Sequence, residues 1–147
     1  MLKWLGILAL FLACTLFGIF KAAALFYRQK RLQEICLFID SVADRVRVGD
    51  EMHSIIESAG GSAGFYKDGY NIFVKEDNLR NTDIKLATDF IHGLGMGDTQ
   101  SQLKRCETYS ELFKRELKIA EKEVKEKASV YGKLGVFIGL LIGIVLI

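Results

Sequence analysis

The last seventeen residues, Tyr131–Ile147, constrain this chain more than any other feature. Beyond Lys133 every residue is apolar, and Gly135, Gly139 and Gly143 recur at every fourth position. Residues four apart lie on one face of a helix, where glycine lets a second helix approach closely. The segment 131–147 therefore predicts a C-terminal transmembrane helix that packs through these three glycines. The helix has to enter the membrane from Tyr131, with Lys133 reaching back to the headgroups, because the apolar part alone is short for a span.

A second apolar segment opens the chain. Residues 1–27 carry only two charged side chains and are long enough to cross about 30 Å of hydrocarbon. Two other interpretations are a signal peptide cleaved at Ala22–Ala24 and a lipoprotein anchored at Cys14. The basic block at 28–31 follows directly and resists translocation, which favours an uncleaved N-terminal transmembrane helix.

Charge is unevenly distributed along the chain. Counted as Lys and Arg against Asp and Glu, the net charge is +3 over 28–31, −6 over 32–100 and +3 over 101–133. Basic residues lie on the inner side of both apolar segments, so both segments place the central domain, 28–130, in the cytosol. No basic patch alternates with aromatic residues, which argues against nucleic acid as a partner.

The central domain has the periodicity of helices. Apolar residues three, four and seven apart continue from the first span to Val48, where Gly49 is expected to end the helix. Asp50 is expected to cap a short helix over 51–59. The apolar face of the first helix consists of Leu25, Leu32, Ile35, Ile39, Val42 and Val46.

Two more helices are predicted after residue 80. One covers Thr82–His92, capped by Asn81 or Thr82. Glycines at 93–97 then break the chain, and Asp98 or Thr99 caps a long charged heptad helix that runs on into the last span. The heptad positions are Leu103, Cys106, Phe113, Leu117, Ala120, Val124 and Tyr131, interrupted by Ser110. These elements predict an all-α fold, a membrane-anchored antiparallel helical bundle.

One stretch departs from helical periodicity. Residues 65–74 place an Asp-Gly pair between aromatic and β-branched residues, which is typical of a β-hairpin. A two-stranded hairpin needs support from other elements, so a short helix with loops is an equal alternative.

The sequence offers no recognisable catalytic or metal-binding pattern. The glycines at 93–97 follow a helix and lack the Gly-Lys-Ser/Thr ending of a phosphate loop, so a connector is favoured. His53 and His92 have no second ligand at metal spacing. Cys14, Cys36 and Cys106 show no paired spacing, and the last two lie on apolar helix faces. We expect no cofactor, no small-molecule substrate and no enzymatic activity.

Acidic residues gather in the part of the domain farthest in sequence from the two spans. They could steer a basic partner to this surface, although a merely solvated face explains them equally well. The candidate docking residues are Glu51, Glu57, Asp68, Glu76, Asp77, Asp83 and Asp89.

A short motif connects these observations to a known family. Leu94, Gly95, Asp98 and Gln102 precede a Lys- and Glu-rich helix and the ending Leu134-Gly-Val-Phe-Ile-Gly. This order resembles the stage III sporulation protein AB family, in which a Leu-Gly pair, a helix-starting Asp and a Gln precede a charged helix and a Leu-Gly-x-x-x-Gly span. The middle of the chain is shorter than in that family, lacks proline and has residues 65–74 where helix is expected.

The resemblance implies a two-pass protein of the mother-cell membrane in endospore-forming bacteria, part of the assembly linking mother cell and forespore. Its soluble part is similar to the cytoplasmic domain of platform proteins in type II secretion and type IV pilus systems. Those platforms contact an ATPase, so the implied partners are the sporulation stage III ATPase, other membrane subunits, lipid or a second copy. The alternative is an exported or lipid-anchored helical protein of the cell envelope.

Overall fold

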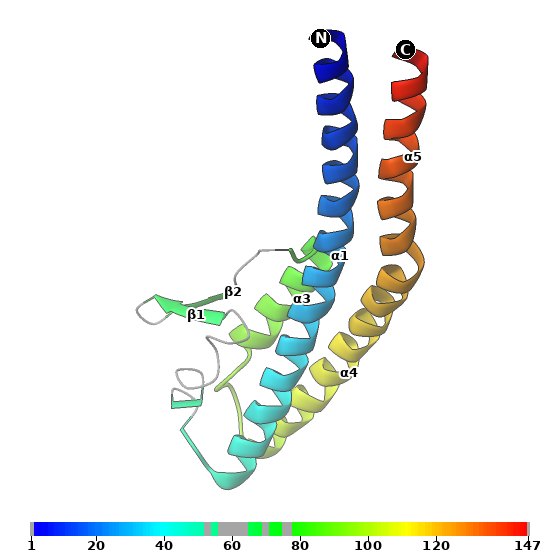
Figure 1. Cartoon of the computed structure of the whole chain (residues 1–147). Coiled ribbons are helices and arrows are strands. Elements are labelled where there is room, and N and C mark those ends of the chain that lie inside the picture. The colour runs from blue at the N-terminus through cyan, green and yellow to red at the C-terminus, as the bar shows by residue number, and fades with distance from the viewer. Residues whose placement is uncertain (1, 52–53, 56–64, 69–70, 75–77, 147) are drawn as a thin grey trace. The chain divides into compact units, whose positions relative to one another are not determined.

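A computed structural model describes residues 2–51, 54–55, 65–68, 71–74 and 78–146 (Figure 1). The chain divides into two compact units. One contains Met1–Tyr27 together with Ala120–Ile147, and the other contains Arg28–Ile119. We call them the terminal unit and the central unit.

Helix α1 covers Leu2–Val48 without interruption, 47 residues in all. It contains no proline and therefore no point at which a backbone hydrogen bond must be lost. It ends where Gly49 adopts φ +91°, a left-handed conformation in which its N–H donates to the carbonyl of Arg45 at 3.0 Å. The predicted continuity of the first helix and its glycine stop are both confirmed.

The central unit is built on the second part of α1, with α3 (Asn81–His92) and α4 (Thr99–Glu123) beside it (Figure 1). Phe90 of α3 joins the other two helices, because its ring lies 6.4 Å from that of Phe38 and 5.4 Å from that of Tyr109. The fully buried apolar side chains of this core are Leu32, Ile35, Ile39, Val42, Ile55, Ala87, Phe90 and Phe113. Of the face predicted for α1, the residues from Leu32 to Val46 are thus buried, whereas Leu25 is partly exposed.

Helix α3 begins one residue earlier than predicted, and its cap differs. The N-cap residue is Arg80, whose backbone N–H donates to the Asp83 carboxylate at 3.0 Å. Neither Asn81 nor Thr82 is the cap, because the acid three residues beyond the N-cap reaches back to the backbone instead. Helix α4 begins as predicted, with Asp98 accepting a hydrogen bond from the N–H of Ser101 at 3.2 Å.

The stretch 65–74 forms two short strands. Strand β1 (Phe65–Asp68) pairs antiparallel with β2 (Asn71–Val74), with Phe65 opposite Val74 and Asp68 opposite Asn71. Of the helix predicted over 51–59, Ser54 and Ile55 are helical, and the rest of its interior lies outside the described residues.

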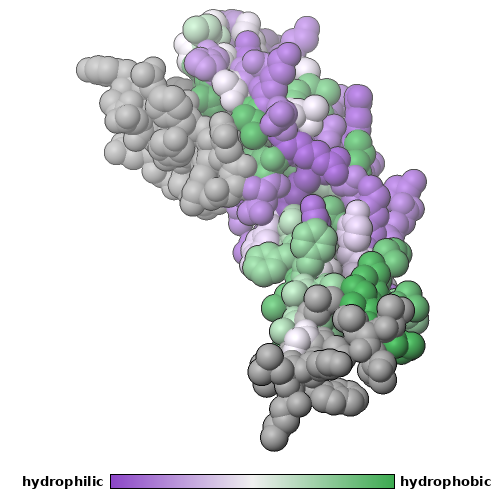
Figure 2. All heavy atoms as spheres, turned by 90° about the horizontal axis from the view of Figure 1, so that it is seen from above, coloured by the Kyte–Doolittle hydropathy of each residue, from purple (hydrophilic) through white to green (hydrophobic). Residues whose placement is uncertain are grey.

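The terminal unit pairs the first part of α1 with the last helix of the chain. After α4, a π-helical turn, η1 (Val124–Ala128), leads into α5 (Ser129–Leu146). Hydrophobic side chains gather over this helix pair in Figure 2. The strongly exposed ones include Phe17, Ile19, Phe20, Phe137, Leu141 and Ile144.

The π-helical turn changes which face of the last helix is buried. Counted in sevens from buried Ala120, the heptad would reach Lys127 and Leu134. The structure instead buries Ala128 and Gly135, one residue later in each case. A π-helical turn contains one residue more than an α-helical turn, so it shifts the register by that residue. The prediction that the heptad continues to Tyr131 is therefore wrong, and this side chain is 37% exposed.

Among the described residues, one helix is long and apolar enough to cross a membrane, the part of α1 from Phe11 to Val48. This agrees with the predicted membrane association. Helix α5 contains 18 residues and no charged side chain after Lys133. A second crossing by α5 and the cytosolic position of the central unit stay predictions.

Candidate functional site

A buried ion pair connects α1, α3 and α4 in the central unit. Arg28 of α1 donates from Nε and Nη2 to the two carboxylate oxygens of Asp83 in α3, at 2.8 and 3.0 Å. The same Nη2 lies 3.1 Å from Glu116 Oε2 in α4. The Arg28 side chain is 4% exposed and that of Asp83 0%. Two parallel, charge-assisted hydrogen bonds between desolvated partners fix both distance and orientation.

This pairing corrects the predicted acidic docking surface at one position. Asp83 is buried and bonded to Arg28, so it is not available to a partner protein. Glu51 and Asp89 are exposed, whereas Asp68 lies in β1. Glu57, Glu76 and Asp77 lie outside the described residues. This difference could not be predicted, because the charge pattern alone does not show which acid has a distant partner.

The family motif forms a hydrogen-bonded connector between α3 and α4. Gln102 is 4% exposed, and its Nε2 donates to the carbonyls of Gly93, at 3.4 Å, and Met96. Its Oε1 accepts from the Gly95 N–H at 3.3 Å. One amide thus satisfies three backbone groups of the connector, and the helix that carries Gln102 holds it in place.

The other motif residues complete this connector. Gly95 has φ +80°, a conformation that suits glycine, and the Leu94 N–H donates to the Ile91 carbonyl at 3.1 Å. Ser101 donates to Asp98 from its backbone and its hydroxyl, and these bonds lower the pKa of the Asp98 carboxyl. Here the four motif residues have a structural role in turning the chain from α3 to α4.

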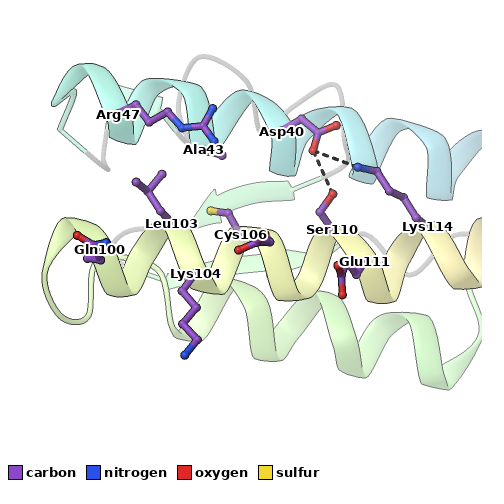
Figure 3. Close-up of a pocket in the computed structure, with 11 residues that line it drawn as sticks. Asp40, Ala43, Arg47, Gln100, Leu103, Lys104, Cys106, Ser110, Glu111 and Lys114 are labelled. Carbon is purple, nitrogen blue, oxygen red and sulfur yellow. Dashed lines mark hydrogen bonds and ion pairs between the residues drawn. The ribbon is translucent and has the colours of Figure 1, made fainter.

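A polar groove of about 650 Å³ lies between α1 and α4 (Figure 3). Ser110, which interrupts the heptad, donates to Asp40 Oδ1 at 3.1 Å, and Lys114 Nζ lies 3.8 Å from the same oxygen. The interruption therefore supplies a polar link across the two helices. Both signs of charge line the groove, since Arg47 and Lys104 accompany the acids.

The buried cysteines of the central unit are poorly suited to redox chemistry. Burial raises the pKa of Cys36 to about 11, with a further contribution from nearby Asp40. Burial also raises the pKa of Cys106. A protonated thiol is a weak nucleophile and a weak metal ligand. Among the described residues, no group of three or more His, Cys, Asp or Glu side chains could hold a metal ion.

Close approach of backbones defines the terminal unit. A Cβ added at Gly135 would lie 3.0 Å from the Cys14 carbonyl oxygen, and one at Gly18 would lie 2.7 Å from that of Tyr131. A Cβ at Gly139 would lie 2.6 Å from the Phe11 ring. Two of the three glycines singled out from the sequence thus face α1. The surroundings of Gly143 are outside what the structure describes, and Gly18 was missed because it has no glycine neighbour at helical spacing.

These features define a class of protein: a small helical domain that contains a buried ion pair and is continuous in sequence with apolar terminal helices. The family model for stage III sporulation protein AB matches residues 63–147, more than half of the chain. The chain belongs to this family, a family of structural sporulation proteins that is not known as enzymatic. No curated protein and no solved structure matches the chain.

Proposed function

We propose that this protein is a non-enzymatic membrane platform of the sporulation assembly that links mother cell and forespore. Two spans anchor it in the mother-cell membrane, and the central unit docks a cytosolic ATPase of that assembly. The observation that carries the proposal is the family match over residues 63–147. The continuity of α1 supports it, because one helix belongs to both the apolar and the charged part of the chain.

The buried contact at the start of the central unit suits a platform. Arg28 is the first residue of that unit, and it bonds to α3 and α4 directly after the apolar segment. A buried, hydrogen-bonded ion pair is costly to break once formed. Force or displacement transmitted along α1 would therefore reach the other two helices through this contact as well as through the apolar core.

A topology experiment tests the two-pass arrangement. A reporter that is active only in the cytosol, inserted at Gly61 of the full chain, is expected to be active. The same reporter fused after Ile147 is expected to be inactive. Activity of a reporter that works only outside the cytosol, at Gly61, would instead support an exported or lipid-anchored protein and reject the platform.

Charge reversal tests the ATPase contact. We expect Glu51→Lys and Asp89→Lys, both at exposed positions, to weaken binding of the full chain to the ATPase. Added salt should weaken the wild-type complex as well, because electrostatic steering is screened. Asp44→Lys, an exposed acid on α1 outside the candidate surface, is the matched control. Equal binding by all variants at every salt concentration would show that the acidic residues form only a solvated face.

A further inference from the structure

A second groove lies in the terminal unit. Most of the residues that line it are apolar, and a charged residue lies at one end. The groove has a volume of about 470 Å³ and lies between α1 and α5. Its α1 wall includes Ala13, Cys14 and Phe17, and its α5 wall includes Leu134 and Ile138. Gly18 and Gly135 also line it, and they are in close contact. Glycine has no side chain to fill the space above this contact, which leaves a depression between the two rows of apolar side chains.

The polar groups of this groove lie at one end. The contact of Gly18 with the Tyr131 backbone and of Gly139 with the Phe11 ring shows that the two helices run in opposite directions. Lys21 and Tyr131 are the lining residues nearest the central unit in sequence, on α1 and α5 respectively. From Ala13 to Lys21 the groove extends roughly 12 Å along the axis of α1, at 1.5 Å per helical residue. That is somewhat less than one leaflet of a hydrocarbon core about 30 Å thick.

Lys21 has no carboxylate partner among the described residues. Its Nζ lies 5.7 Å from the centre of the Phe17 ring, a cation–π contact that leaves the side chain exposed. An ammonium group beside an apolar groove attracts an anion that is attached to an apolar chain. A neighbouring transmembrane helix would need an acidic side chain at this depth to satisfy Lys21, and such residues are rare within spans.

We propose that this groove binds an anionic phospholipid, with one acyl chain along the glycine contact and the phosphate at Lys21. The inference rests on the membrane insertion proposed above. The Tyr131 hydroxyl, at the same end of the groove, is the second group available to the headgroup region, where tyrosine is commonly found in membrane proteins.

Lipid retention tests the proposal. The full chain is reconstituted into vesicles of equal parts phosphatidylcholine and phosphatidylglycerol, extracted in mild detergent, and its retained lipid is identified by mass spectrometry. Phosphatidylglycerol is expected to be enriched about fivefold, the ratio that one basic residue near a membrane surface provides. Lys21→Gln is expected to abolish the enrichment. Lys30→Gln, an exposed lysine farther along α1, is the control and should retain it.

A second pair of variants tests the groove itself. Ala13→Trp fills it and should reduce the retained lipid severalfold, whereas Leu12→Trp, at an exposed neighbouring position that does not line the groove, should not. Retention of both lipids in the vesicle ratio by the wild type would overturn the proposal. So would unchanged enrichment in Lys21→Gln, or disulfide-linked dimers through Cys14 in the absence of bound lipid, which would indicate a second copy in the groove.

Alkaline extraction of the same vesicles separates this inference from the proposed function. Release of the wild-type protein into the supernatant would reject membrane insertion and with it the platform. A protein that stays in the membrane but shows no lipid preference would reject the lipid site alone.

Discussion

At the scale of single residues, Arg28 and Asp83 form an ion pair inside the central unit. The pair is desolvated, and its geometry allows two parallel hydrogen bonds. Desolvation offsets much of the Coulomb attraction of such a pair, so its net contribution to stability is small. Loss of one partner is different, because it leaves the other charge buried and incompletely bonded. The pair therefore favours one arrangement of α1 and α3 over alternatives in which either charge lacks its partner.

We predict that Asp83→Asn destabilises the protein by about 3 kcal/mol, the lower end of the range for breaking a buried pair. Thermal unfolding of the full chain in detergent, followed by circular dichroism, measures the change. Asp44→Asn is the control, because Asp44 and Arg47 form a pair whose side chains are 74% and 65% exposed. Such a pair is worth less than about 1 kcal/mol. Similar shifts in both variants would show that the buried pair has no special role.

The two thiols of the central unit provide a second prediction at this scale. A pKa of about 11 at Cys36, raised from 9.0, means that the thiol stays protonated at pH 8. Its thiolate fraction is then about a hundredfold smaller than that of an ordinary cysteine. Maleimide labelling of Cys36 and Cys106 at pH 8 should accordingly be slow in the folded protein and fast in denaturant. Rapid labelling without denaturant, located by peptide mapping, would contradict the burial of these side chains.

At the scale of secondary-structure elements, η1 decides which face of α5 meets α1. If the same residues 124–128 formed an ordinary α-helix, Leu134 would take the position that Gly135 occupies, and Ile138 that of Gly139. Both glycine positions are too close to α1 for a larger side chain. The two apolar side chains displaced by η1 instead line the groove between α1 and α5. One inserted residue thus produces both the close helix contact and the groove beside it.

We predict that insertion of one alanine after Lys125, within η1, lowers the melting temperature of the full chain. Leu134 and Ile138 would then face α1 at positions with no room for them. Adding Leu134→Gly and Ile138→Gly to the insertion should recover most of the loss, although glycine weakens a helix by about 1 kcal/mol per residue. The same two substitutions without the insertion are the control and should only destabilise. An insertion with no effect would show that η1 does not set the register.

At the scale of the whole molecule, two long helical stretches belong both to the apolar terminal unit and to the central unit, which carries most of the charged residues. Helix α1 and the run from α4 through η1 to α5 each extend through both compact units. Hydrophobic side chains stay exposed along the terminal pair, because two helices alone cannot cover them. Exposed apolar surface of this extent is stable in lipid and a liability in water. This favours membrane insertion of the pair.

We predict that Gly139→Leu disrupts the pairing of the terminal helices in the membrane, because its Cβ alone would come within 2.6 Å of the Phe11 ring. Cysteine crosslinking between α1 and α5 in isolated membranes is the measurement. Gly132→Leu is the matched control, since a Cβ there meets nothing within 4 Å. Unchanged crosslinking in Gly139→Leu would reject the glycine contact as the interface.

The features that could be predicted from the residues alone depend on local chemistry. The length of α1, its end at Gly49, the start of α4 at Asp98 and the apolar face of α1 depend on residues within a turn or two of each other. Such local signals can be recognised directly in the sequence. They were sufficient for the helical class, and with the motif around Gly95 they led to the family.

Other features depend on residues far apart in the chain and could be identified only in the folded protein. Arg28 and Asp83 are 55 residues apart. The residues next to Asp83 in the sequence therefore do not show that this acid, unlike other acidic residues of the domain, is buried. The contact of Gly18 with Gly135 joins opposite ends of the chain. The register of α5 depends on how a single π-helical turn forms between two packed faces. Local alternatives of similar energy are decided by long-range packing. In α5, this packing places the glycine face against α1.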